Sequence, residues 1–221
     1  LHDAYIGVPK LQNFGDLTHI LMISRNEIMK SKQGTVFELG CGNSHFLMLC
    51  AKIGWSVSGI DFQKSSLDNL YMKLNTNKAN IGEIIYDNAL TYDPSILYSS
   101  FDVLASFGFI EHFDNPMEIL SKWIRVLKPG GKVITAVPNL QSLNAFLLKR
   151  FDPSVWNKHK PITPRELDQI HIGNGLVVSA AARYYGKYEL DMLVPWKTIS
   201  KHHHRSFKLL RYIGSYILTP L

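Results

Sequence analysis

The sequence predicts an α/β fold, a doubly wound and mostly parallel sheet with helices on both faces. Short apolar runs alternate with segments of helical periodicity along residues 34–138, and a glycine-rich turn joins the first run to its helix. This alternation is typical of βαβ units with right-handed crossovers, whose ligands bind beyond the carboxyl ends of the strands. We therefore expect a Rossmann-like sheet of seven strands in one domain, because 221 residues are too few for two ordinary domains.

The first half of the chain supplies the clearest elements. A strand is expected at Thr35–Leu39, followed by a helix over Ser44–Ile53 whose apolar residues follow a helical spacing. A second strand, Ser56–Ile60, leads to Asp61, and Ser65 is the expected cap of a helix that ends near Asn75. The other elements expected in this half are strands at Glu83–Tyr86, Phe101–Ser106 and Lys132–Val137, a helix over Pro116–Leu127 and a chain break at Lys128–Gly131.

The last third of the chain has weaker signals. Gln141–Arg150 has the pattern of an inserted helix, and Thr163 followed by Pro164 and Glu166 forms a good helix start. Two closing strands are expected at Leu176–Tyr185 and Tyr188–Val194. The final segment, Phe207–Leu221, has a helical apolar stripe that predicts docking on the domain or on a second copy of the chain, with a membrane surface as the alternative.

The glycine turn Gly40-Cys41-Gly42 lies between the first strand and its helix. Glycine suits a tight turn that a ligand approaches closely, but dinucleotide-binding proteins use such turns as well. Their fingerprint needs a third glycine, and His45 stands at that position here, which argues against a dinucleotide. Asp61, 19 residues after Gly42, is placed to accept the hydroxyls of a ribose.

Five stretches, taken in order, resemble the motifs of class I S-adenosylmethionine (SAM)-dependent methyltransferases: ELGCGN, GID, DNAL, SFGFIEHF and LKPGG. The resemblance covers roughly residues 34–138 and implies SAM as the cofactor and S-adenosylhomocysteine as its product. It implies that Gly40, Cys41 and Gly42 lie along the methionine part, with Glu38 beneath the amino group. Two alternatives stay open: Cys41 as a small loop residue without chemistry, and Glu38 as a cap for neighbouring amides.

The same resemblance assigns roles around the adenosine. It implies that Asp61 holds the ribose hydroxyls and that Phe62 covers one face of the adenine. Residues implied at the adenine edge and beside the sulfonium are Asp87, Asn88, Ala89, Ser106 and Phe107. Two alternatives stay open: Phe62 as ordinary core packing and Asp87 as a turn-forming aspartate.

Glu111-His112 followed by an aromatic residue is similar to two small-molecule groups, the ubiquinone-biosynthesis O-methyltransferases and, over a shorter stretch, the cyclopropane-fatty-acid synthases. The first resemblance extends more weakly over residues 139–170. Members of that group that bind a divalent ion carry a further glutamate three residues earlier, and Gly108 stands there in this chain. We therefore expect no metal. The Asn/Asp-Pro-Pro-aromatic tetrapeptide of base-amine methyltransferases is absent, which argues against a base amine as the acceptor. The resemblance to the O-methyltransferases implies a hydroxyl oxygen of a small-molecule or lipid-linked acceptor.

Two histidines are candidates for the base that removes the acceptor's proton. His112 is the first, because it follows the fourth strand near the expected sulfonium, and its alternative is a histidine that orients the loop. His159, on the loop before Thr163, is the second, with an ordinary surface histidine as its alternative. The adjacent His202, His203 and His204 are not expected to bind metal, because neighbouring side chains point in different directions.

The charge distribution and the cysteine content limit the possible functions and the expected cellular compartment. Residues 1–140 carry 12 basic and 13 acidic side chains, whereas residues 141–221 carry 12 and 5. The basic part keeps RNA methylation open as a rival function, and a non-catalytic partner subunit of the same fold is another. Two cysteines, no expected signal peptide and no apolar run of about 18 residues favour a cytoplasmic protein without a membrane span. We divide the single domain into an N-terminal lid (1–33), a SAM-binding core (34–138) and a substrate insertion with closing strands and C-terminal helix (139–221).

Overall fold

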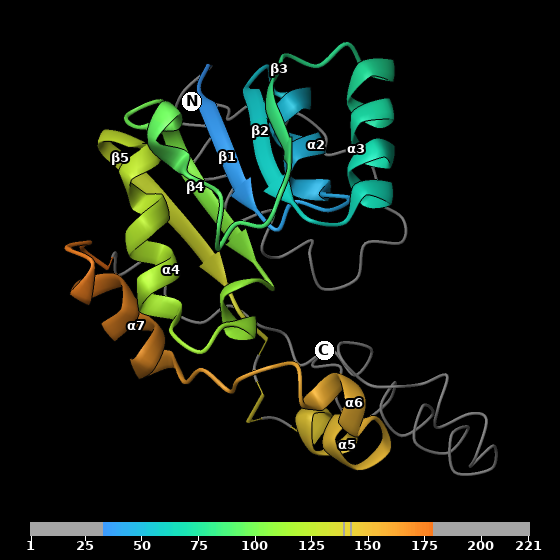
Figure 1. Cartoon of the computed structure of the whole chain (residues 1–221), viewed down its shortest axis with the longest axis vertical. Helices are drawn as coiled ribbons and strands as arrows, with labels where there is room; N and C mark the ends of the chain where they lie inside the picture. Colours follow the sequence, from blue (N-terminus) through green and yellow to red (C-terminus); the bar gives the residue numbers. More distant parts are fainter. Residues whose placement is uncertain (1–32, 139, 142, 179–221) are drawn as a thin grey trace, which may run out of the picture.

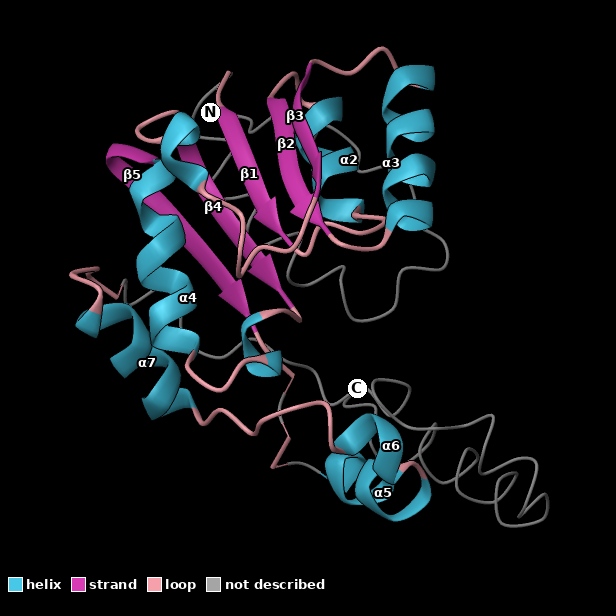
Figure 2. Ribbon diagram, in the orientation of Figure 1, coloured by secondary structure: helices cyan, strands magenta, loops and turns pink. Residues whose placement is uncertain are grey.

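The computed structural model of the 221-residue chain describes residues 33–138, 140–141 and 143–178 (Figure 1). Its centre is a five-stranded sheet in the order β3-β2-β1-β4-β5, and every neighbouring pair is parallel. The strands are β1 (Thr35–Leu39), β2 (Ser56–Asp61), β3 (Ile81–Tyr86), β4 (Phe101–Phe107) and β5 (Leu127–Ala136). Because all strands run the same way, their carboxyl ends meet at one edge (Figure 2).

The strand order reverses at β1. The chain moves outward from β1 through β2 to β3, and then crosses to the other side of β1 to form β4 and β5. In parallel α/β sheets the crevice at such a switch point is where ligands bind. The arrangement therefore places a binding edge beyond Leu39 of β1 and Ser106 of β4, which are register partners.

Neighbouring residues of β1 pack into separate apolar clusters. Val36 packs with residues of α2 (His45–Lys52) and α3 (Lys64–Thr76), whereas Phe37 packs with residues of α4 (Pro116–Trp123), the 3-10 helix η3 (Ile124–Val126) and α7 (Pro164–Gly173). Alternate residues of a strand point to opposite faces of a sheet. Phe37 stacks on the buried Trp123 with 5.2 Å between ring centroids. Burying side chains of this size contributes about 1.5–3 kcal/mol each, which makes the sheet a rigid base for its edge.

Local signals predicted two helix starts correctly and one incorrectly. The Ser44 hydroxyl caps α2 by accepting from the Leu47 amide, and Thr163 caps α7 in a full capping box with Glu166. The cap expected at Ser65 is wrong, because α3 begins at Lys64 and Gln63 occupies the cap position without a side-chain bond. The Gln63 amide donates instead to Asp61 Oδ1, so a side chain before the helix holds this turn.

The expected chain break at Lys128–Gly131 is also wrong. These residues lie inside β5, which pairs Phe101 with Leu127 and Val103 with Lys132, with an irregularity in the register between the two pairs. A bulge therefore absorbs the Pro-Gly-Gly sequence without ending the strand. The preceding helix is shorter than predicted, since α4 ends at Trp123 and η3 fills the last turn.

The insertion after β5 forms two short helices, α5 (Leu143–Phe151) and α6 (Pro153–Trp156). The expected inserted helix is thus confirmed, and Leu140, Ala145 and Leu148 pack against Val155 and Trp156. Two further 3-10 helices, η1 (Pro94–Leu97) and η2 (Ile110–His112), precede and follow β4.

Several expectations concern parts that the structure does not describe. The described residues contain five strands, and the two closing strands expected at Leu176–Tyr185 and Tyr188–Val194 lie almost wholly beyond residue 178. The lid at residues 1–32, the histidine run at 202–204 and the helix at 207–221 also lie outside the described residues. Within the described ranges, no helix has the length and apolar character that crossing a membrane requires.

Candidate active site

The glycine loop after β1 has a backbone that only glycine adopts easily. Gly40 and Gly42 have φ values of +66° and +35°, in the left-handed region. The Gly40 and Cys41 amides donate to the Ile60 carbonyl at 2.9 and 3.1 Å, which fixes the loop on the end of β2. A Cβ at Gly40 would stand 2.6 Å from Cδ2 of Phe109. Phe109, which sequence reasoning missed, therefore lies directly against this loop.

Asp61 connects the glycine loop to the turn after β2. Its Oδ2 accepts from the Gly42 amide at 2.8 Å and its Oδ1 accepts from the Gln63 amide at 2.7 Å. An ionised carboxylate has about four lone-pair sites, so each oxygen keeps one for a ligand. Two free acceptor sites on one carboxylate suit a vicinal diol such as the ribose hydroxyls.

Glu38 is a buried carboxyl beneath the loop, only 4% exposed. Burial raises its pKa to about 8, against the lowering effect of the hydrogen bond from Ser44, and nearby Asp61 raises it slightly more. The Ser44 hydroxyl donates to Glu38 Oε2 at 2.5 Å. A cation brought to this carboxyl would favour its ionised form, so the site is suited to the ammonium group of an amino acid.

The residues expected at the adenine edge lie on the turn after β3, whereas Phe62, expected on the adenine face, follows β2. Asp87 Oδ1 accepts from the Asn88 amide at 2.6 Å, and Asn88 Oδ1 accepts from the Leu90 amide at 2.9 Å. Both side chains are exposed and organise the turn, as the structural alternative for Asp87 proposed. Phe62 is 74% exposed, which rules out core packing and leaves its ring available to a base.

The turn after β3 is tied to α4 by contacts that the sequence did not indicate. The Ala89 carbonyl accepts from Nε1 of Trp123 at 3.1 Å and from Nζ of Lys122 at 3.3 Å. Both donors come from one helix, so α4 holds the adenine turn in place. Ala89 itself is buried.

Three further residues at the carboxyl edge differ in character. Cys41 is buried, its side chain lies 2.8 Å from where a Cβ of Gly59 would stand, and burial raises the pKa of its thiol. It is therefore a packing residue. Ser106 is fully buried, and its Oγ has no hydrogen-bond partner among the described residues. Phe107 packs edge-on against Phe46 with 4.9 Å between ring centroids. The unpaired hydroxyl of Ser106 points to a ligand group at the end of β4.

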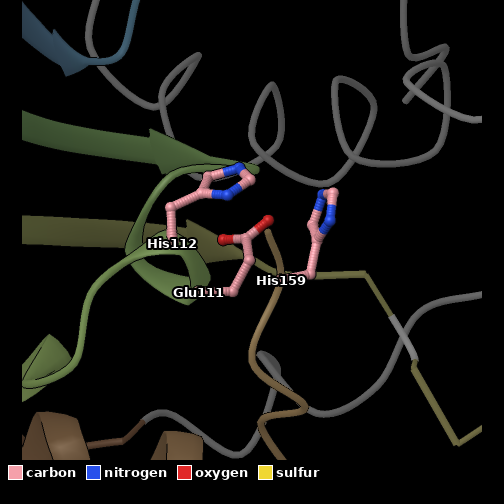
Figure 3. A group of neighbouring side chains, drawn as sticks. All are labelled: Glu111, His112 and His159. Atoms are coloured by element: carbon pink, nitrogen blue, oxygen red, sulfur yellow. The ribbon is translucent and has the colours of Figure 1, made fainter. Parts of the chain in front are cut away.

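The structure brings the two candidate histidines together. The ring centroids of His112 and His159 are 4.5 Å apart, although the residues are 47 positions apart in the sequence. His112 Nδ1 lies 2.7 Å from the Lys158 carbonyl, and His159 Nδ1 lies 2.8 Å from the Val155 carbonyl. Figure 3 shows the Glu111 carboxylate pointing between the two rings.

The sequence singles out Glu111 only as the neighbour of His112 and does not indicate that its side chain is buried. It is 1% exposed, and burial raises its pKa, although the His112 charge acts in the opposite direction. Its backbone carbonyl accepts from the Lys160 amide at 2.8 Å. This bond joins the loop after β4 to the end of the insertion, and so assembles the histidine pair.

Comparison with known proteins agrees with this geometry. Residues 37–135 match the family described as "Methyltransferase domain". A probable S-adenosylmethionine-dependent methyltransferase of Mycolicibacterium smegmatis is 28% identical over 107 residues, 47% of this chain and 38% of that protein. A ubiquinone biosynthesis O-methyltransferase of Hydrogenovibrio crunogenus is 28% identical over 185 residues, 76% of this chain and 74% of that protein.

A solved structure agrees as well. The crystal structure of a SAM-dependent methyltransferase from Archaeoglobus fulgidus superposes with a TM-score of 0.54 at 26% identity, and covers 71% of this chain and 67% of that one. The residues present fit SAM: the open glycine backbone, the free acceptor sites of Asp61, the exposed ring of Phe62 and the unpaired hydroxyl of Ser106. The fold, the cofactor edge and the family match over residues 37–135 together support a class I SAM-dependent methyltransferase.

Proposed function

We propose that the chain transfers a methyl group from SAM to a hydroxyl oxygen of a small-molecule or lipid-linked acceptor. The observation that carries this proposal is the pairing of His112 with His159 beyond the end of β4. Methylation of a hydroxyl requires removal of a proton, whereas a neutral amine needs no base. The Hydrogenovibrio relative, named an O-methyltransferase, supports the same chemistry.

In this proposal the cofactor residues mainly bind and orient. Gly40, Cys41 and Gly42 would lie along the methionine part, with Glu38 beneath the ammonium group. Asp61 would hold the ribose, Phe62 would cover the adenine, and Asp87, Asn88 and Ala89 would border its edge. SAM supplies the methyl group as a sulfonium. Ser106 and Phe107 would border that centre, and holding it in line with the acceptor supplies most of the rate.

The hydrogen bonds of the histidines define which nitrogen is basic. A backbone carbonyl only accepts, so Nδ1 of His112 carries the proton that it donates to Lys158, and the lone pair lies on Nε2. The same holds for His159 and Val155. The acceptor oxygen would form a bond to the methyl carbon as the carbon–sulfur bond breaks, and its proton would pass to Nε2 of His112, with His159 as the second candidate.

The cellular setting and the remaining architecture belong to the same proposal. Cys41 and Cys50 are free and buried, which fits a reducing, cytoplasmic compartment. The complete sheet would have seven strands with helices on both faces, and the N-terminal segment around Tyr5–Phe14 and the insertion at residues 139–160 would cover the acceptor. The C-terminal helix would dock on the domain or on a second copy of the chain.

The proposal is tested by turnover with catechol-type and other small hydroxyl acceptors, with S-adenosylhomocysteine release as the readout. Ether products identified by mass spectrometry would support it. Methylation of amines or of RNA, with no reaction at any hydroxyl, would contradict the oxygen as target and leave the SAM-dependent family assignment standing.

A further inference from the structure

The two imidazoles beyond β4 are arranged as metal-binding histidines are. Each is held through Nδ1 by a backbone carbonyl, that of Lys158 for His112 and that of Val155 for His159. A histidine that binds a metal through one nitrogen almost always donates from the other to a carbonyl or a carboxylate, which fixes the ring. Both rings therefore present an Nε2 lone pair from a fixed orientation.

The third donor is the carboxylate of Glu111. It is 1% exposed, and its Oε2 has no hydrogen-bond partner among the described residues. A buried carboxylate oxygen without a partner is costly. The nearby ammonium of Lys160 is engaged with Asp114, so this side chain does not compensate Glu111. Figure 3 shows the Glu111 carboxylate beside the rings of His112 and His159.

We propose that Glu111, His112 and His159 bind a divalent transition-metal cation, with zinc as the best match. One donor atom from each residue lies within 4.8 Å of the others. Tetrahedral zinc ligands lie about 3.4 Å apart, so rotations that move each atom by about 1 Å or less complete the site. Two imidazoles and one carboxylate form a zinc donor set, and three protein ligands leave a fourth position open.

This proposal departs from the expectation of no metal, which rested on Gly108 alone. Glycine there does remove one donor from the loop after β4. The fold supplies another from the insertion, because the bond between the Lys160 amide and the Glu111 carbonyl brings His159 beside His112. A histidine nitrogen in place of a second carboxylate shifts the metal preference of the site from magnesium toward zinc.

The proposal rests on the proposed function only for the consequence of binding. A bound cation lowers the pKa of a hydroxyl or water that it coordinates. In the metal-free chain Nε2 of His112 remains available as the proposed base. In the zinc-bound chain both Nε2 lone pairs would be ligands, and an acceptor hydroxyl at the open position would lose its proton to solvent. Binding itself is measurable without SAM or an acceptor.

In the first test, zinc chloride is titrated into the metal-free full chain and binding is measured by calorimetry. In the second, cobalt(II) is titrated and its visible absorption is recorded. The background carries H202A, H203A and H204A, which removes the histidine run as a competing ligand. One zinc per chain and intense four-coordinate cobalt bands are expected. Glu111→Gln and His159→Ala should each weaken zinc binding more than about 100-fold, since loss of a residue that merely orients a ligand already costs about 10- to 100-fold.

The matched control is Asp114→Asn, an exposed acid beside the cluster that is outside the proposed donor set. It should bind zinc as the parent does. Each variant is also titrated with S-adenosylhomocysteine, so that a misfolded preparation is recognised by the loss of both ligands. The proposal would be overturned if the parent did not bind zinc stoichiometrically. It would also be overturned if Glu111→Gln and His159→Ala bound zinc as tightly as the parent. Zinc binding without any methyl transfer would contradict the proposed function and leave this site intact.

Discussion

The carboxylate of Asp61 accepts a hydrogen bond from the Gly42 amide at 2.8 Å, across the gap between the first two strand ends. Asp61→Ala should weaken S-adenosylhomocysteine binding by about 1.5–3 kcal/mol, the usual value of a charge-assisted hydrogen bond. Isothermal titration calorimetry measures the change against a one-to-one complex with the parent chain.

Asp61→Asn is the matched variant, because its side-chain oxygen can still accept from Gly42 while the second acceptor is lost. Its affinity should lie between those of the parent and Asp61→Ala. Equal affinity of all three proteins would show that this carboxylate does not hold the cofactor. Tight binding of NAD with none of S-adenosylhomocysteine would contradict the cofactor assignment itself.

His112→Ala should lower kcat by about 10²–10⁴, the range that a positioned general base supplies. S-adenosylhomocysteine affinity should stay near that of the parent, because the loss falls on the chemical step. Steady-state kinetics with a hydroxyl acceptor and calorimetry on the same preparations provide the two readouts. Full turnover by His112→Ala with loss in His159→Ala would move the base to the insertion, and full turnover by both would remove the hydroxyl acceptor from consideration.

Glu38→Gln should change how stability depends on pH. The folded chain keeps Glu38 protonated up to a pKa of about 8, whereas the unfolded carboxyl ionises at its ordinary value of 4.5. Between these values the unfolded state binds fewer protons, so rising pH favours unfolding. The variant lacks this effect, and its free energy of unfolding relative to the parent should rise with pH by at most about 1.4 kcal/mol per unit.

Urea denaturation of ligand-free protein between pH 5 and about 8 measures this difference. Glu166→Gln is the control, because hydrogen bonds from Thr163 lower the pKa of that carboxyl and confine its titration to more acid conditions. A flat difference between Glu38→Gln and the parent across the window would mean that Glu38 is ionised in the folded chain.

Gly40→Ala should destabilise the fold and weaken S-adenosylhomocysteine binding together. The left-handed backbone costs a side chain about 1–2 kcal/mol, and the new methyl group meets Phe109 at 2.6 Å. Phe109→Leu in the same chain should recover part of the binding. Thermal unfolding and calorimetry measure the two effects.

Gly54→Ala tests whether left-handed backbone strain alone weakens S-adenosylhomocysteine binding, or whether the strain must lie in the glycine loop. Gly54 has a φ of +88° with open space around it and lies away from the cofactor edge. This variant should lose stability and keep S-adenosylhomocysteine binding. If it lost binding as Gly40→Ala does, global destabilisation would explain both and the glycine loop would carry no special role.

Sequence patterns predicted the features that depend on interactions between residues close together in the chain. Thr163 was expected to cap its helix and does so through an amide three residues away, so the sequence was sufficient there. Ser44 caps α2 in the same way, although only a helix over Ser44–Ile53 was expected. Ser65 failed because Asp61 holds the turn before α3 from outside the helix. The strand ends and the glycine loop could be predicted, since parallel βαβ units bring them to one edge regardless of side-chain detail.

The histidine pair could not be assembled from the sequence. Both residues were candidates, but 47 positions separate them, including α4, β5 and the insertion helices, and their contact depends on how the insertion folds back. Glu111 was missed for a related reason: its burial and unpaired oxygen are properties of tertiary packing. The expectation of no metal considered only the loop after β4, whereas the proposed donors would come from that loop and from the insertion.

The insertion is anchored to the loop after β4 through main-chain atoms, the Lys160 amide and the Glu111 carbonyl. Such a bond does not depend on which side chain stands at position 160, provided it is not proline. Related chains can therefore exchange most of the α5–α6 segment during evolution while the second histidine keeps its place. If the proposed function holds and the insertion contacts the acceptor, acceptor preference would then be exchangeable on a constant cofactor platform, and grafting that segment between relatives would be a direct way to test it.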